Sequence, residues 1–171
     1  MREKRHILHN FVLYSVFAFY IFLLCILLFR TVHPVRSLNL VPFRSIIRYL
    51  SGQDQHLHAF ALSNVLGNIV LFFPLGVYLT LFHRDKRISV NLLWIVLTSL
   101  MVEIIQYTFR LGIGDIDDIL LNGFGGLLGI AAYRILLLKV KDAGKVRRII
   151  EIIAPIGGII CFLILFLYNT L

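Results

Sequence analysis

The sequence predicts an all-α polytopic membrane protein, a single membrane domain over residues 1–171 with about five transmembrane helices. Hydrophobic residues make up 59% of the chain and the mean hydropathy is +0.88, more apolar surface than a soluble domain of this length could bury. The apolar residues also fall into runs near the roughly 20 residues that a helix needs to cross a hydrocarbon core of about 30 Å. These runs cover residues 11–29, 60–82, 89–108, 119–138 and 149–168.

The first apolar run follows a basic start and could be read as a secretion signal. It is longer than the usual apolar core of such a signal, and residues 30–34 contain no small-residue cleavage pattern. We therefore expect it to be retained as a helix. The two cysteines, Cys25 and Cys161, lie within apolar runs, where a thiol behaves as a small hydrophobic group. The sequence thus predicts no disulfide, no cysteine-based metal framework and no cofactor.

The loops differ in their content of basic residues, and this difference predicts the orientation because Lys and Arg are concentrated in short cytoplasmic loops. With the N-terminus inside, eleven basic residues face the cytoplasm: Arg2, Lys4, Arg5, Arg84, Lys86, Arg87, Lys139, Lys141, Lys145, Arg147 and Arg148. Five face outward: Arg30, Arg36, Arg44, Arg48 and Arg110. We therefore expect the N-terminus in and the C-terminus out. This topology accounts for the net charge of +8, so no nucleic-acid partner is expected.

A short amphipathic helix is predicted in the loop that follows the first run. Its apolar residues recur at i, i+3, i+4 and i+7, namely Phe43, Ile46, Ile47 and Leu50. The other face carries Arg44 and Arg48, and Pro42 suits the first turn. Such a helix would lie on the outer leaflet with its arginines at headgroup level. It serves either as a cap on the bundle or as a contact for a substrate or a lipid headgroup.

Polar residues occur in the outer parts of the second and third runs. Asn64 and Asn68 lie one helical turn apart, and Glu103 and Gln106 are spaced as i, i+3. Charged groups at membrane depth cost roughly 2.5–3.5 kcal/mol each on insertion scales, so their convergence indicates a site. The asparagines either join neighbouring helices or contact a ligand. Glu103 either pairs with Arg110, seven residues further on, or acts as an acid or base.

The loop before the fourth run is rich in aspartate. Asp115, Asp117 and Asp118 stand at the start of the predicted helix, where acidic side chains cap free amides, and Asn122 follows one turn later. Hard cations favour carboxylates, so these aspartates with Glu103 could hold a divalent metal, but their spacing matches no standard metal loop. We therefore predict no metal site. The same run carries a small-residue face suited to close helix packing, with Gly125, Gly126 and Gly129.

In the predicted topology these polar groups reach one membrane face, which predicts a ligand site. The lining residues are Asn64, Asn68, Glu103, Gln106, Arg110, Asp117, Asp118 and Asn122. Glu103 and Asp118 are the candidates for a catalytic acid or base, and Arg110 could hold a phosphate or carboxylate. In the structural alternative, the polar groups only hold the helices together.

Several motifs, in this order, resemble the VanZ-like family of small bacterial membrane proteins. The motifs are Asn39-Leu-Val-Pro42-Phe43, Asn64-Val-Leu-Gly-Asn68, Phe73-Pro74-Leu75-Gly76, Glu103-Ile-Ile-Gln106, and Arg110 to Asp117-Asp118 and Asn122 with Gly126 and Gly129. Each motif is short, so the resemblance depends on their order and spacing. It spans about residues 36–133 and leaves the flanking helices, 11–29 and 149–168, outside.

The resemblance implies a role at the cell envelope, in a bacterial plasma membrane. The namesake of the family is associated with reduced susceptibility to the lipoglycopeptide teicoplanin, and the resemblance supplies no catalytic residues. We therefore expect a protein that contacts membrane lipids and binds a lipid-linked envelope precursor or a glycopeptide-like amphiphile at the outer leaflet. The alternatives are an enzyme acting on a lipid-linked envelope precursor and a small transporter or flippase, although no inverted repeat is visible.

Overall fold

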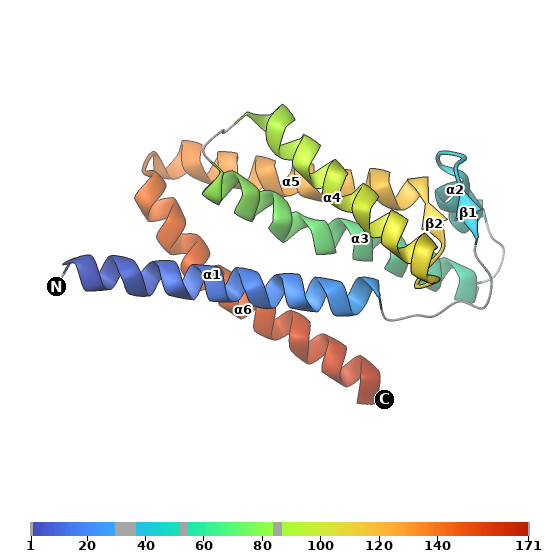
Figure 1. Cartoon of the computed structure of the whole chain (residues 1–171), viewed down its shortest axis with the longest axis horizontal. Coiled ribbons are helices and arrows are strands. Elements are labelled where there is room, and N and C mark those ends of the chain that lie inside the picture. The colour runs from blue at the N-terminus through green and yellow to red at the C-terminus, as the bar shows by residue number, and fades with distance from the viewer. Residues whose placement is uncertain (1, 30–36, 52–54, 84–86, 171) are drawn as a thin grey trace. The chain divides into compact units, whose positions relative to one another are not determined.

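The structure is a helical bundle with apolar helices long enough to cross a membrane, which confirms the predicted fold class. The computed structural model describes residues 2–29, 37–51, 55–83 and 87–170, with side chains over 10–29, 37–47, 64–83, 87–160 and 162–163. In these ranges the chain forms six helices and two short strands (Figure 1). They are α1 (Arg2–Leu28), β1 (Leu38–Asn39), α2 (Arg44–Ser51), α3 (Gln55–Phe82), α4 (Ile88–Phe109), β2 (Gly114–Asp115), α5 (Ile116–Val140) and α6 (Ala143–Thr170).

Four of the five predicted transmembrane runs correspond to candidate membrane spans in the described residues. These spans are Asn10–Leu28, Asn64–Phe82, Ile88–Phe109 and Ile116–Val140. The fifth predicted run, 149–168, lies within α6, but the side chains of residues 161 and 164–170, Cys161 among them, are outside the described residues. Five spans and the orientation across the membrane therefore stay predictions.

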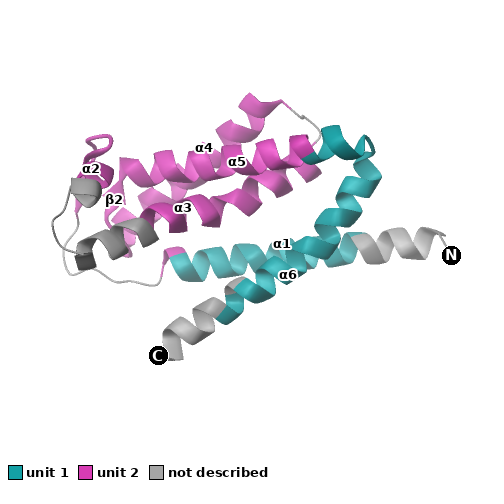
Figure 2. Ribbon diagram, turned by 180° about the vertical axis from the view of Figure 1, so that it is seen from behind, with its two compact units in different colours: residues 1–27, 136–171 teal, residues 28–135 magenta. Residues whose placement is uncertain are grey.

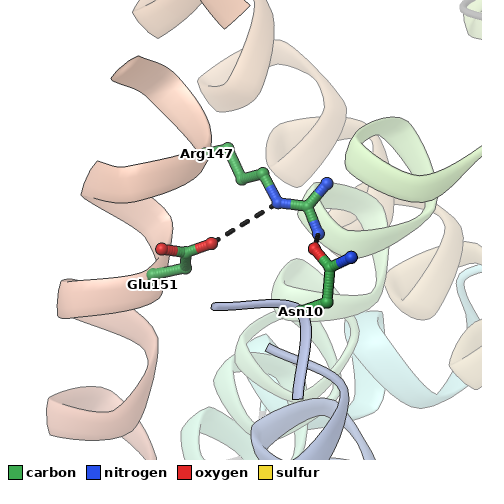
Figure 3. Close-up of polar contacts among 3 residues, drawn as sticks. All are labelled: Asn10, Arg147 and Glu151. Atoms are coloured by element: carbon green, nitrogen blue, oxygen red, sulfur yellow. Dashed lines mark hydrogen bonds and ion pairs between the residues drawn. The ribbon is translucent and has the colours of Figure 1, made fainter. Parts of the chain in front are cut away.

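The chain divides into two compact units (Figure 2). One comprises residues 1–27 and 136–171, and the other comprises residues 28–135. In the first unit, Arg147 of α6 donates a hydrogen bond from Nη2 to Asn10 Oδ1 of α1 at 2.6 Å and forms an ion pair with Glu151 (Figure 3). Further along both helices, the rings of Phe19 and Phe162 lie 6.3 Å apart. The two helices therefore run in the same direction.

In the second unit, α3 and α5 pack with their backbones in contact. A Cβ atom at Gly76 would lie 2.0 Å from the carbonyl oxygen of Gly126, and one at Gly129 would lie 2.1 Å from that of Phe73. No side chain larger than hydrogen fits at either position. Gly126 in turn faces the side chain of Ile95 on α4. The predicted packing face of glycines on α5 is confirmed, and it brings α5 against both α3 and α4.

Two short parallel strands and α2 lie at the end of this unit where α4 ends and α5 begins (Figure 1). β1 pairs with β2 so that Leu38 is opposite Gly114 and Asn39 is opposite Asp115. The predicted amphipathic helix is present, but it begins at Arg44, one residue after Phe43, which adopts a left-handed backbone conformation with φ 63°. The expectation that Pro42 forms part of the first turn is therefore wrong.

Candidate functional site

The buried carboxylate of Asp117 caps the start of α2 although it belongs to α5. Its Oδ1 accepts a hydrogen bond from the backbone N–H of Phe43 at 2.5 Å, and its Oδ2 accepts one from Ser45 at 2.8 Å and a longer one from Ile46 at 3.4 Å. The side chain is 1% exposed. A negative charge at a helix N-terminus is favoured by the free amides and by the helix dipole. Asp117 therefore fixes the position of α2, and both of its oxygens are occupied.

Asp115 connects the strand pair to α2 and α4. Its Oδ1 accepts a hydrogen bond from Asn39 Nδ2 at 2.9 Å, and its Oδ2 accepts one from Ser45 Oγ at 2.5 Å. Its backbone N–H donates to Glu103 Oε2 at 2.8 Å. Glu103 is 6% exposed, so this predicted site residue is nearly enclosed by the bundle. The loop before α5 is thus held by side chains from three other elements.

Asp118 accepts hydrogen bonds from both asparagines of α3 that were predicted to line the site. Asn68 Nδ2 donates to Asp118 Oδ1 at 2.6 Å, and Asn64 Nδ2 donates to the same oxygen at 3.4 Å. Asn68 is 7% exposed, whereas Asp118 is half-buried and Asn64 is exposed. The predicted meeting of α3 and α5 at these residues is present. This trio is the part of the site that is open toward its surroundings.

Asn122 and Gln106, two more predicted site residues, make contacts away from the trio. Asn122 is 1% exposed and donates from Nδ2 to Ser99 Oγ on α4 at 2.8 Å, while its buried Oδ1 accepts no hydrogen bond from a described residue. Gln106 donates from Nε2 to the carbonyl oxygen of Leu28, at the end of α1, at 2.8 Å. Asn122 therefore joins two helices in the core, and Gln106 caps the end of a third.

Arg110 lies apart from these contacts. It terminates α4 in a left-handed conformation, with φ 60° and ψ 32°, and its backbone N–H donates to the carbonyl oxygen of Gln106. Its side chain is exposed, and within the described residues no ion pair joins it to Glu103. The ion pair considered as one alternative for these two residues is therefore not formed. Arg110 is available to a ligand outside the bundle and does not neutralise the buried carboxylates.

Four carboxylates consequently gather at one end of the bundle, and each accepts hydrogen bonds within the protein: Glu103, Asp115, Asp117 and Asp118. Glu103 and Asp118 each lie close enough to Asp115 and to one another to interact electrostatically. In the part of the chain that the structure describes, no three His, Cys, Asp or Glu residues are placed to hold a metal ion. The arrangement can accept hydrogen bonds from a ligand or exchange protons with it.

Sequence reasoning missed three residues that build this region: Asn39, Ser45 and Ser99. Asn39 and Ser45 bind Asp115, and Asn39 also donates to Ser45 Oγ at 3.1 Å. Ser99 is fully buried and binds Asn122. The only signal for the first two was the resemblance of residues 39–43 to a family segment. Ser99 could have been found from its spacing, one turn before Glu103 on the same face of α4.

Comparison with known proteins places this architecture in a family. The sequence profile described as VanZ/LLP1 matches residues 11–138, which include most of α1, the strand pair, α2, α3, α4 and most of α5. This chain belongs to the VanZ/LLP1 family. The match takes in the first helix as well as the range 36–133. All of the residues that form the polar end of the bundle therefore lie within the region shared with the family.

A curated relative agrees with this membership. Protein VanZ of Enterococcus faecium is 29% identical over 135 residues, which cover 79% of this chain and 73% of the relative. No solved structure gives a significant match to the chain. The family and the four apolar spans together indicate a membrane protein, as the sequence predicted.

Proposed function

We propose that this VanZ/LLP1 protein is an envelope protein of a bacterial plasma membrane that binds a lipid-linked or glycopeptide-like amphiphile at the outer leaflet. We propose further that its presence alters susceptibility to lipoglycopeptides of the teicoplanin type. The ligand site is the open trio of Asn64, Asn68 and Asp118, and the buried carboxylate of Glu103 lies at the same end of the bundle. The inferred outward orientation depends on the distribution of basic residues among the loops.

The observation that supports this proposal best is the state of the Asp118 carboxylate. Both amides of α3 bind its Oδ1, which orients the group, while its Oδ2 accepts no hydrogen bond from a described residue. The residue is only half-buried and the adjacent Asn64 is exposed, so a ligand can approach from that side. A carboxylate held in one orientation with one free oxygen is suited to receive a donor.

The chemistry of the site favours a ligand headgroup rich in donors. The carboxylates of this region carry negative charge or accept hydrogen bonds, and sugar hydroxyls, peptide N–H groups and amines are their complements. Such groups occur in the headgroups of both lipid-linked envelope precursors and glycopeptides. The apolar faces of the surrounding spans accommodate the acyl part of an amphiphile, because exposed Leu, Ile and Phe side chains cover them. Membership of the VanZ/LLP1 family supports the envelope role.

A second candidate function is an enzyme acting on a lipid-linked envelope precursor. It is favoured by one observation: Glu103 and Asp118 are carboxylates on different helices that lie close enough to interact electrostatically, and one is enclosed while the other is half-buried. Paired carboxylates in different environments are a common arrangement for a general acid and a general base. Arg110 would then bind the phosphate of the precursor from its exposed position at the end of α4.

The proposal is tested by the dose response to a lipoglycopeptide in cells that express the protein or its variants at equal membrane abundance. Asp118→Asn keeps the shape and the hydrogen-bond acceptor for the two amides but removes the charge. Asp142→Asn is the matched control, because Asp142 is exposed and caps Gly144 and Lys145 through one oxygen only. We expect Asp118→Asn to abolish the shift in susceptibility and Asp142→Asn to retain it.

Purified wild-type and variant proteins separate the two candidate functions. If cells that express Asp118→Asn still show the full shift in lipoglycopeptide susceptibility, a ligand site at this carboxylate is contradicted. For the enzyme, purified wild-type protein should convert a lipid-linked precursor, and Glu103→Gln should lower that rate by about 100-fold or more, the range expected for a general acid or base. Absence of turnover in a protein that binds the precursor excludes the enzyme in favour of the binder.

A further inference from the structure

We propose that residues 38–47, which comprise β1 and the first half of α2, form a docking surface for anionic phospholipid headgroups at the interface of the membrane with water. Half of the ten residues are large apolar side chains that are 53–65% exposed: Leu38, Leu40, Val41, Phe43 and Ile47. Exposed apolar side chains this close together in the chain are typical of a contact with a partner or a membrane. We call these ten residues the β1–α2 surface.

The position of the β1–α2 surface in the fold sets its depth. β1 pairs with β2, and β2 lies between the end of α4 at Phe109 and the start of α5 at Ile116. Both helices are candidate membrane spans, so the strand pair lies at the level where the spans end. Between Asn39 and Arg44 the backbone is not helical, and free backbone amides are not tolerated in hydrocarbon. The surface therefore belongs at headgroup depth, with its apolar side chains directed into the acyl boundary.

The exposed charge of the β1–α2 surface is basic, whereas the nearby acidic side chains are engaged in hydrogen bonds within the protein. Arg44, the first residue of α2, is exposed, and no ion pair joins it to a described acidic residue. The nearby Asp115 and Asp117 are instead engaged with Asn39, Ser45 and the amides at the start of α2. The accessible charge is therefore positive, which complements the phosphate of an anionic lipid.

The β1–α2 surface cannot fold back to cover its apolar residues. Asp117 holds the first amides of α2, and Ser45 Oγ is bonded to Asp115, which is itself held by Asn39. The β1–β2 pairing fixes the other end of the segment. The exposure of the apolar side chains is therefore built into the fold, and the membrane interface is the occupant whose depth and charge match. This inference is independent of whether the Asp118 trio binds a ligand.

The test uses tryptophan fluorescence of the full-length protein in lipid nanodiscs. Trp94, the only tryptophan, is 52% exposed on the span α4 and serves as the matched control in the unaltered protein. The probe protein carries Trp94→Phe with Leu40→Trp, and Val41→Trp is the second probe if the first does not fold. Nanodiscs contain phosphatidylglycerol or phosphatidylcholine with brominated acyl chains, at equal mole fraction in unlabelled phosphatidylcholine, and quenching is compared.

We expect both brominated lipids to quench the probe. Brominated phosphatidylglycerol should be enriched near it by up to about five-fold, which corresponds to the attraction of one basic residue to an anionic lipid surface. Arg44→Gln should remove this preference and leave quenching by phosphatidylcholine unchanged. Trp94 should be quenched equally by the two lipids. The proposal is overturned if neither lipid quenches the probe, which places the surface in water or under another partner. It is also overturned if the two lipids quench equally before Arg44 is replaced.

Discussion

Replacing Asp117 by Asn should destabilise the protein far more than the same change at the neighbouring Asp118. Both oxygens of Asp117 accept backbone N–H groups of the α2 start, Oδ1 from Phe43 and Oδ2 from Ser45. An asparagine has only one oxygen, so either orientation turns its NH₂ group toward a donor. At Asp118, both amide donors use Oδ1, and an asparagine retains that acceptor.

The expected cost follows from the bonds lost. A hydrogen bond to a charged group contributes about 1.5–3 kcal/mol, and a buried N–H left without a partner costs about 1–3 kcal/mol. Asp117→Asn should therefore lower the free energy of unfolding by about 2–4 kcal/mol. Asp118→Asn exchanges charged for neutral hydrogen bonds, a loss of about 1 kcal/mol, and relief of repulsion from Asp115 and Asp117 offsets part of it.

Thermal unfolding of the purified variants in detergent, followed by Trp94 fluorescence, measures this difference. A loss of 1 kcal/mol lowers Tm by about 2–4 °C in a chain of this size, so the two variants should differ by several degrees. Their membrane abundance should differ in the same order. Equal Tm values for Asp117→Asn and Asp118→Asn would show that Asp117 does not cap α2, and the account of how the loop is held would fail.

The remaining predictions concern helix packing and topology. Gly76→Ala should prevent the close approach of α3 and α5, because its Cβ would meet the Gly126 carbonyl oxygen at 2.0 Å, whereas Gly157→Ala has nothing within 4 Å and should be tolerated. Yield of monodisperse protein after size exclusion compares the two, and equal yields would contradict the packing of these helices. On a Cys25→Ser and Cys161→Ser background, a membrane-impermeant thiol reagent applied to intact cells should label Gly112→Cys and spare Gly144→Cys. The opposite pattern would reverse the orientation and move the proposed site to the cytoplasmic face.

The sequence predicts the spans well because burial in lipid requires long apolar runs, and such runs are visible without knowledge of tertiary contacts. Helix limits are less predictable, since α3 begins at Gln55 and α6 at Ala143, several residues before their apolar runs start. These extensions contain polar and basic residues, so hydropathy does not mark them as parts of a helix. The glycines of α5 were also informative, because only a close backbone contact explains several of them on one helix.

The roles of the individual aspartates could not be predicted. Asp115, Asp117 and Asp118 lie within four residues of the sequence, yet their partners differ. Asp115 binds the side chains of Asn39 and Ser45, Asp117 binds backbone amides of α2, and Asp118 binds the asparagines of α3. These roles depend on where residues 39–46 lie, and a strand pair of two residues carries no periodic signal. Helical spacing also placed Arg110 on the same face as Glu103, but α4 ends before it, at Phe109.

The most direct test of the central claim is photo-crosslinking from position 64 in living cells. A photoreactive amino acid replaces the exposed Asn64, and lipids joined to the purified protein after irradiation are identified by mass spectrometry. We expect an amphiphile with a sugar- or peptide-bearing headgroup, enriched over bulk phospholipid and lost when Asp118→Asn is added, while Asp142→Asn leaves it unchanged. Recovery of bulk phospholipids alone, in their membrane proportions and with the same yield in all three proteins, would contradict a ligand site at this end of the bundle.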